Sequence, residues 1–345
     1  MKLGLSLGYW GSRPPEGVGE LVAEAERLGV DSVWTSEAYG SDALTPLAWH
    51  GAATSRLRLG TAIAQMSART PAATAMAAIT LDHLSGGRFV LGLGASGPQV
   101  VEGWYGAPYA RPLARTREYV EMVRTVLRRE ALVHDGAHYR VPLEGGTGLG
   151  KPLRSTVRPL RADLPIMLAA EGPKNISLAA EIADGWLPFF LTPHDDGFAR
   201  ERLRIGFDAR TDGADPALFE VVCPVNVVVD DDVEAAADRL RPMIALYVGG
   251  MGAKGANFHL DAVARLGFEA ECAAIQDAYL AGRKEEAMRL VPTSMVEQIA
   301  LVGSRAKIRD ELAAWEDSVV TTMIVVGDAT ALRTMAVLVE PGAPA

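Results

Sequence analysis

The stretch LRLGTAIAQMSARTPAATAMAAITLDHLSGGRFVLGLGASGP, residues 57–98, holds one complete unit of the predicted fold. Its outer parts, residues 57–65 and 88–95, are apolar at nearly every position, which is typical of parallel strands that helices cover. The alanine-rich middle, residues 70–85, predicts a helix. The stretch therefore predicts a strand, a helix and a second strand of one parallel sheet.

The same alternation fills the first hundred residues and resumes farther along the chain. It predicts eight strands, at residues 2–10, 31–37, 57–65, 88–95, 165–173, 186–192, 219–229 and 319–327. A parallel sheet of this kind is either a barrel or doubly wound, and eight units favour a (β/α)8 TIM barrel, whose active site lies at the carboxyl ends of the strands. We expect a single barrel domain over residues 1–345.

Two insertions into the barrel are expected. A Gly- and Pro-rich stretch at about residues 135–163 has no convincing element of its own, and it follows a helix predicted from about Thr116 to Glu130. A helical block from about Asp231 to Asp317 is much longer than one barrel helix. We interpret it as the seventh barrel helix plus an added helical segment at about residues 245–300.

Composition limits the possible functions. The formal charge of -9 and the pI near 5.3 argue against nucleic acid or an anionic membrane as a partner, since both need a basic surface. Cys223 and Cys272 are too few and too isolated for a disulfide framework or a zinc site, and no metal site is expected. Without a signal peptide or a membrane-spanning run, we expect a cytoplasmic protein with a small-molecule substrate. Order is expected everywhere except in the tail VEPGAPA.

The glycines of GLGASG fit the G-x-G-x-x-G template of dinucleotide-binding proteins, with Gly92, Gly94 and Gly97 in register. That template requires a following helix and, about 20 residues later, an acid at the end of the next strand. Here Trp104 and several Gly and Pro residues break the chain soon afterwards, and Glu118 lies in a helical pattern. The sequence therefore disfavours an NAD-binding Rossmann domain.

Two glycine loops, at residues 95–98 and 169–175, each follow a strand and precede a helical segment. Backbone N–H groups at such turns bind anions without a basic side chain. Two of them on one barrel rim predict a phosphate-bearing cofactor, although an ordinary turn would explain either loop alone. The predicted contacts are Ala95, Ser96, Gly97, Pro98, Ala170, Glu171, Gly172, Pro173 and Lys174.

Glu37 and Tyr39 follow the second strand, where a barrel builds its active site. A carboxylate and a phenol at that position can orient a substrate or transfer a proton, so both are candidate catalytic residues. A structural alternative is that Glu37 pairs with a neighbouring strand end and that Asp42 caps the next helix.

The third strand ends in small residues. Thr61 and Ala62 precede Ile63 and Gln65, and small side chains permit a flat ring system to lie against the backbone. Relief of crowding inside the barrel is the alternative explanation of the same residues.

Four collinear motifs over nearly the whole chain resemble the luciferase-like superfamily of flavin and deazaflavin enzymes, and within it the coenzyme F420-dependent oxidoreductases. They are VWTSEAYGSDA, LRLGTAIAQ with the glycine-rich strand that follows it, AAEGPKNISLAAEIADGW, and VGSRAKIRDELAAWEDSVVTTMIVV. The resemblance implies a (β/α)8 barrel, a homodimer or higher homo-oligomer, and F420 at the strand ends.

By this resemblance the deazaflavin lies against Thr61, Ala62 and Ile63, and the two glycine loops hold its phosphate-bearing tail. Glu37 matches the acidic position after the second strand. The resemblance also implies a cis peptide bond between Ala62 and Ile63.

Some members carry a glutamate in the strand-four loop and a histidine after the strand-two acid. Here those positions hold Ser96 or Gly97 and Ala38, so that particular proton chemistry is not expected.

The predicted function is an F420-dependent oxidoreductase that transfers a hydride between the deazaflavin C5 and an unidentified organic substrate. An FMN-dependent monooxygenase of the same fold, with FMN as the cofactor, is the nearest alternative. A barrel that binds a flavin or deazaflavin without turnover is a second one.

Overall fold

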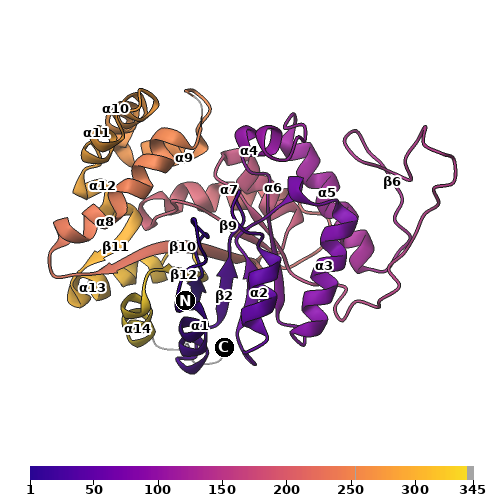
Figure 1. The fold of residues 1–345 in the computed structure, drawn as a ribbon, viewed down its shortest axis with the longest axis horizontal. Coiled ribbons are helices and arrows are strands. Elements are labelled where there is room, and N and C mark those ends of the chain that lie inside the picture. Colours follow the sequence, from indigo (N-terminus) through magenta and orange to yellow (C-terminus); the bar gives the residue numbers. More distant parts are fainter. Residues whose placement is uncertain (253, 340–345) are drawn as a thin grey trace.

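The computed structural model describes residues 1–252 and 254–339, and a closed barrel of 8 parallel strands forms its centre (Figure 1). The barrel strands are β1 (Lys2–Ser6), β2 (Ser32–Thr35), β3 (Arg58–Thr61), β5 (Phe89–Gly94), β8 (Ile166–Ala169), β9 (Gly185–Leu187), β10 (Glu220–Val229) and β12 (Thr322–Val326). They pair in chain order, and β12 returns to β1 and closes the ring. The predicted (β/α)8 barrel is confirmed. The tail from residue 340 lies outside the described residues.

The strands are buried on both faces, as their continuous apolar sequences predict. All six residues of β5 are buried, so this strand has no face toward water. The barrel interior is filled by six side chains from six strands, which pack as one cluster: Trp34, Val90, Met167, Leu187, Val222 and Ile324. The interior is therefore a packed core, and a ligand has to bind at an end of the barrel.

Helices surround the barrel, and their starts follow local sequence signals. The outer helices are α1 (Val18–Arg27), α2 (Leu44–Gly51), α3 (Pro71–Leu84), α5 (Pro112–Leu127), α6 (Pro173–Ile182), α7 (Asp196–Ala209), α13 (Arg305–Glu316) and α14 (Ala329–Leu338). At α3 the Thr70 hydroxyl accepts a hydrogen bond from the Ala73 N–H, as a capping threonine does. Helix α5 begins at Pro112, earlier than the predicted start near Thr116, because proline is suited to the first turn of a helix.

The third predicted strand is divided into two. β3 ends at Thr61, and the short β4 (Ala64–Gln65) pairs with β5 beyond it. The peptide bond between them, from Ala62 to Ile63, is cis, which confirms that prediction. The 3-10 turn η1 (Met66–Ala68) then leads into α3.

The stretch at about residues 135–163 projects away from the barrel (Figure 1). It was predicted to contain no element, but β6 (His134–Asp135) and β7 (Arg140–Val141) form an antiparallel pair at its base. Glu118 of α5 anchors the turn between them, since its carboxylate accepts three backbone N–H groups from residues 137–139. The strands were missed because each has two residues, too few to show a period.

The helical block after β10 contains a strand that the sequence analysis missed. The elements are α8 (Val233–Ala245), the π-helical turn η4 (Leu246–Gly250), α9 (Phe258–Val263), η5 (Ala264–Phe268), α10 (Glu269–Leu280), α11 (Lys284–Arg289), α12 (Thr293–Ile299) and then β11 (Ala300–Gly303). β10 continues past the barrel, and its residues 226–229 pair with β11 in parallel. A run of four apolar residues cannot be told from a helix segment by its period, which explains the error.

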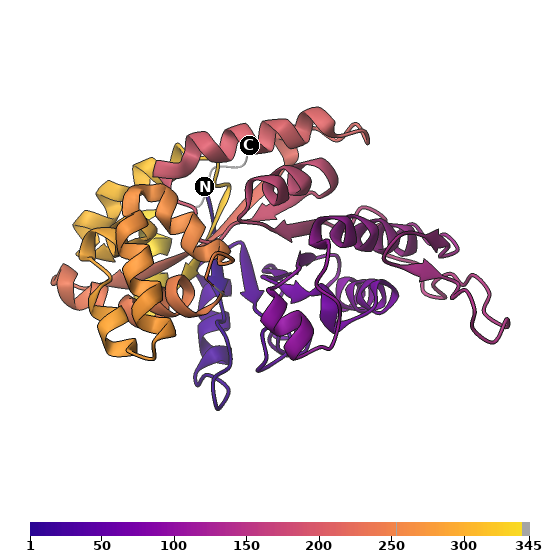
Figure 2. The ribbon, with the colours of Figure 1, turned by 90° about the horizontal axis from the view of Figure 1, so that it is seen from above.

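The segment between β10 and β11 has a hydrophobic core of its own, separate from the barrel core, and it lies to one side of the barrel (Figure 2). Phe190, which follows β9, packs into that second core. The segment is therefore attached to the barrel at the carboxyl ends of the strands, where the candidate site lies.

Candidate active site

The floor of the barrel mouth is made by apolar residues that follow β3 and end β8. Ala62, Ile63 and Ala169 are partly buried and pack on top of the barrel interior. Gly94 lies beneath Ile63, where an added Cβ would come within 2.2 Å of the Ile63 Cδ1. The strand-five glycine thus lets Ile63 lie flat over the barrel, and a planar ring has room to stack above it.

Thr61 supports this floor from below. Its side chain is fully buried, and its hydroxyl both donates to the Gly92 carbonyl at 2.7 Å and accepts from the Gly92 N–H at 2.9 Å. Thr61 therefore ties β3 to β5 and presents no surface to a ligand.

The two predicted anion-binding loops follow neighbouring strands, because β5 pairs with β8. Residues 95–98 lead into the short α4 (Pro98–Gly103), and residues 170–174 lead into α6. An added Cβ at Gly172 would meet nothing within 4 Å, and one at Gly97 would meet the Gln99 side chain at 3.3 Å. Gly172 thus leaves open space beside the backbone, Gly97 meets there only the far end of the Gln99 side chain, and both lie on the same rim as the floor.

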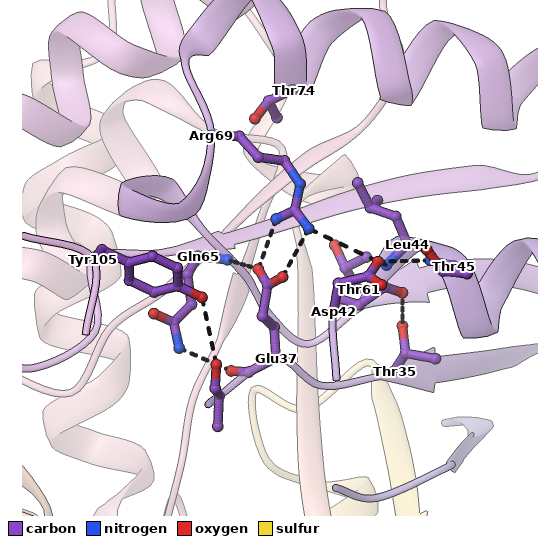
Figure 3. A network of polar contacts seen from close by, with 12 residues as sticks. Thr35, Glu37, Asp42, Leu44, Thr45, Thr61, Gln65, Arg69, Thr74 and Tyr105 are labelled. Carbon is purple, nitrogen blue, oxygen red and sulfur yellow. Dashed lines mark hydrogen bonds and ion pairs between the residues drawn. The ribbon is translucent and has the colours of Figure 1, made fainter. Parts of the chain in front are cut away.

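Glu37 is held in a dense polar network (Figure 3). Its side chain is 3% exposed, and both carboxylate oxygens accept hydrogen bonds of 2.8 Å from the Arg69 guanidinium. One oxygen also accepts from the Gln65 backbone N–H at 2.7 Å, while the Gln65 side-chain amide donates to the Glu37 carbonyl. The hydrogen bond from Arg69 to Glu37 raises the pKa of the guanidinium.

This geometry favours the structural alternative for Glu37. Its carboxylate joins the end of β2 to the segment that carries the floor, and Arg69 completes the pair. Asp42 accepts the N–H groups of Leu44 and Thr45 and so caps α2, as that alternative stated. The catalytic role of Glu37 stays a prediction, and the network assigns it a positioning function.

Three tyrosines lie around the mouth. Tyr39 is 62% exposed, so its phenol is free to meet a ligand. The Tyr9 ring is half exposed while its hydroxyl end is enclosed, and burial raises the pKa of Tyr9 and, more strongly, the pKa of Tyr247. Both enclosed phenols therefore remain protonated at neutral pH.

The helical segment adds an aromatic wall to the mouth, which we define as Phe189, Phe190, Tyr247 and His259. Ring centroids lie 4.7 Å apart for Phe189 and Tyr247 and 4.9 Å apart for Tyr247 and His259. On its other side His259 approaches Glu171, with Nδ1 2.8 Å from a carboxylate oxygen. The Glu171 side chain thus points toward the wall, although its loop was predicted to hold a phosphate.

A groove of about 440 Å³ lies outside the mouth, between α5, α6 and α7. Its lining includes Leu113, Arg117, Lys174, Leu178 and Ile205. Lys174 therefore lies between the predicted anion-binding loop and the outer surface of the barrel. Among the described residues, no group of three or more His, Cys, Asp or Glu side chains is arranged to hold a metal ion.

Sequence reasoning missed Arg69 and the aromatic wall. Arg69 stands directly after the third predicted strand, in QMSARTP, and a cation at a strand end near an acid could have been noted. His259 and Tyr247 carry no such local signal, since they reach the mouth through the packing of the helical segment.

The chain belongs to the luciferase-like monooxygenase family, whose model matches residues 5–322. It is 53% identical over 346 residues to Rv3520c of Mycobacterium tuberculosis, provisionally named a coenzyme F420-dependent oxidoreductase, with 98% of this chain and 99% of that protein covered.

A second relative is 5,10-methylenetetrahydromethanopterin reductase of Archaeoglobus fulgidus, 33% identical over 231 residues, which are 66% of this chain and 64% of that protein. The solved structure of the coenzyme F420-dependent tetrahydromethanopterin reductase of Methanopyrus kandleri superimposes with a TM-score of 0.80 at 22% identity, over 97% of both chains. That likeness shows the same fold. No helix among the described residues is both long and apolar enough to cross a membrane.

Proposed function

We propose that the protein is a coenzyme F420-dependent oxidoreductase that transfers a hydride between the deazaflavin C5 and an organic substrate. The observation that carries this proposal is the 53% identity, over nearly the full length of both chains, to a protein named for that activity. The family also contains monooxygenases, so the barrel alone does not decide between the two chemistries.

The residues at the mouth fit this cofactor. The floor of Ala62, Ile63 and Ala169 offers a flat apolar surface for a ring system. The adjacent loop at Gly172 leaves open space where a phosphate can approach backbone N–H groups, and α6 begins there without a side-chain cap. When bound, F420 supplies or accepts the hydride.

The protein's own residues would position the reactants and manage protons. The Glu37–Arg69 pair holds the segment that forms the floor, so it fixes where a ring can stack. Tyr39 is placed as a candidate proton donor because its phenol is exposed at the rim. Ser36 ties the floor to β2, since its hydroxyl donates to the Ala62 carbonyl at 2.9 Å.

Titration of the purified protein with F420, and separately with FMN, tests the proposal through quenching of tryptophan fluorescence. We expect F420 to bind at least about tenfold more tightly than FMN, a difference of roughly 1.4 kcal/mol. Equal or tighter binding of FMN would favour the monooxygenase alternative. Binding of F420 without substrate-dependent bleaching of its absorbance would favour the non-catalytic one.

We also propose that the protein is a cytoplasmic homo-oligomer. The neighbouring helices α2 and α3 expose Trp49 (78%), Met76 (62%) and Leu84 (75%), large apolar side chains that self-association would cover. Light scattering of the wild type and of Trp49→Glu tests this, and an unchanged mass in the variant would place the contact elsewhere.

A further inference from the structure

The environment of His259 is unlike that of a histidine that only fills space. Its side chain is 23% exposed and that of Glu171 is 13% exposed, so both lie at the inner edge of the mouth. Nδ1 of His259 lies 2.8 Å from a Glu171 oxygen, but off the direction that a hydrogen bond requires, and the second Glu171 oxygen is buried without a partner among the described residues. Buried polar atoms are usually hydrogen-bonded, so an oxygen in that state points to a ligand or water as its partner.

The position of His259 is fixed by one buried residue. The Asn257 side chain donates to the carbonyls of Tyr247 and Val248 and accepts the N–H groups of His259 and Leu260. The turn that carries Tyr247 and the helix that carries His259 are therefore locked together. α9 lies at the same end of the barrel as α4, which follows the strand-five loop (Figure 1).

The second ring nitrogen of His259 is the reactive position. Nδ1 faces Glu171, and the hydrogen bonds of the described residues include none to Nε2. An imidazole with a carboxylate beside one nitrogen and the other nitrogen open is the arrangement of a general acid or base. Tyr247 closes the site on one side and remains a neutral phenol, and Glu171 is the carboxylate beside the imidazole.

We propose that His259, oriented by Glu171, exchanges the proton with the substrate oxygen during hydride transfer, and that the substrate pair is a carbonyl compound and its alcohol. This proposal rests on the proposed F420-dependent function. Glu171 is a positioning residue in it, and His259 is the catalytic one.

The step balances without another reactant. In the reducing direction the carbonyl carbon gains a C–H bond with the two electrons that the reduced cofactor supplies. The π pair of the C=O bond moves to oxygen, which takes the proton from His259 as the N–H bond breaks. The imidazole is left neutral and the product is an alcohol, and the oxidising direction reverses each transfer.

The test compares two kinds of hydride acceptor with the full-length protein and reduced F420. Benzaldehyde and cyclohexanone need a proton at oxygen, whereas the N-methylquinolinium cation accepts a hydride and needs no proton. We expect His259→Gln to slow reduction of the carbonyl probes by about 100-fold or more, the scale of general acid catalysis, and to leave quinolinium reduction almost unchanged. Added imidazole should restore carbonyl reduction to His259→Ala, and Glu171→Gln should show a smaller loss with the same selectivity.

A second measurement does not depend on turnover. Modification of His259 by diethyl pyrocarbonate, followed by mass spectrometry, should be slower with F420 bound, while the exposed His83 on α3 reacts at the same rate with and without it. His83→Gln is the matched control for activity, because His83 lies on the outer surface and contacts the Arg158 carbonyl.

Each outcome decides the matter. Equal slowing of both kinds of acceptor, or of neither, overturns the role of His259, as does unchanged labelling in the presence of F420. Quinolinium reduction without reduction of any carbonyl probe overturns the carbonyl and alcohol class while the F420-dependent function stands. Failure to bind F420, or to reduce any acceptor, overturns the proposed function and this inference with it.

Discussion

Replacing Arg69 with methionine should destabilise the protein far more than loss of a surface ion pair. The change keeps much of the aliphatic stem and removes the guanidinium, whose two nitrogens each lie 2.8 Å from the Glu37 carboxylate. The Glu37 carboxyl would be left at a buried position, with the Gln65 N–H as its remaining partner in the network.

The magnitude follows from burial. Removing one partner of a buried ion pair costs about 3–5 kcal/mol, whereas an exposed pair contributes about 0–1 kcal/mol. Because the Arg69 side chain is 21% exposed, water can partly solvate the site, and we take the lower end, about 3 kcal/mol. In the double variant Glu37→Gln, Arg69→Met no charge is left unpaired, so the two single losses should exceed the double loss by about 2 kcal/mol.

The assay is urea unfolding followed by circular dichroism and by tryptophan fluorescence. The two signals must coincide before free energies are compared, because chains longer than about 150 residues often unfold through intermediates. Arg204→Met is the matched control: Arg204 pairs with Asp208 on the exposed face of α7, and its loss should change stability by less than about 0.5 kcal/mol.

Two results would refute this reasoning. One is a loss for Arg69→Met as small as that for Arg204→Met. The other is simple additivity in the double variant, which would mean that Glu37 and Arg69 act independently. If the pair positions the floor, Arg69→Met should also weaken F420 binding, whereas Arg204→Met should not.

Three further predictions concern backbone packing, the cofactor loop and pH. Gly92→Ala should give insoluble or unfolded protein, because the new Cβ would lie 1.8 Å from the Thr61 carbonyl oxygen, and soluble protein of wild-type stability would contradict this. Gly97→Val should leave thermal stability nearly unchanged and weaken F420 binding in the fluorescence titration, with the exposed helical Gly19→Ala as control; unchanged affinity would place the loop away from the cofactor. Burial raises the pKa of Glu26, but hydrogen bonds from the loop after α2 outweigh it and lower that pKa to about 2. This pKa lies below the unfolded value of about 4.3, so the stability that Glu26 contributes is complete above pH 4.3 and is lost as the pH falls toward 2. Between those pH values the urea midpoint of Glu26→Gln should therefore fall less than that of the wild type. Urea midpoints that fall equally in both proteins would contradict this.

The barrel could be predicted from the sequence because its strands are apolar on both faces and alternate with helices of clear length. Strands such as β5 have no other way to bury every residue. β11 escaped prediction because its four apolar residues follow helices and carry no turn signal. Its strand character comes from pairing with the extension of β10, a tertiary effect that no local window contains.

The candidate site was predictable where it depends on strand ends and glycines. The loops after β5 and β8 lie side by side because their strands pair, as the barrel requires. The partners of single side chains were not predictable. Glu37 and Arg69 are 32 residues apart in the sequence, and Glu171 and His259 are 88 residues apart. The fold brings the members of each pair together, and no local sequence pattern indicates it.

The pairing of β10 with β11 has a consequence for how such enzymes diversify. Residues 230–299 are one greatly lengthened crossover between two adjacent parallel strands, which leaves from the barrel strand β10 and returns to β11 beside it. Each doubling of a loop's length adds only about 0.6 kcal/mol to the free-energy cost of closing it. A crossover of this kind can therefore be lengthened, shortened or exchanged at small cost in stability. Every exchange would rebuild the wall that carries Tyr247 and His259 and leave the floor of Ala62 and Ile63 as it is. A change confined to this one contiguous segment can therefore alter a wall of the mouth while the floor, the predicted cofactor surface, keeps its shape.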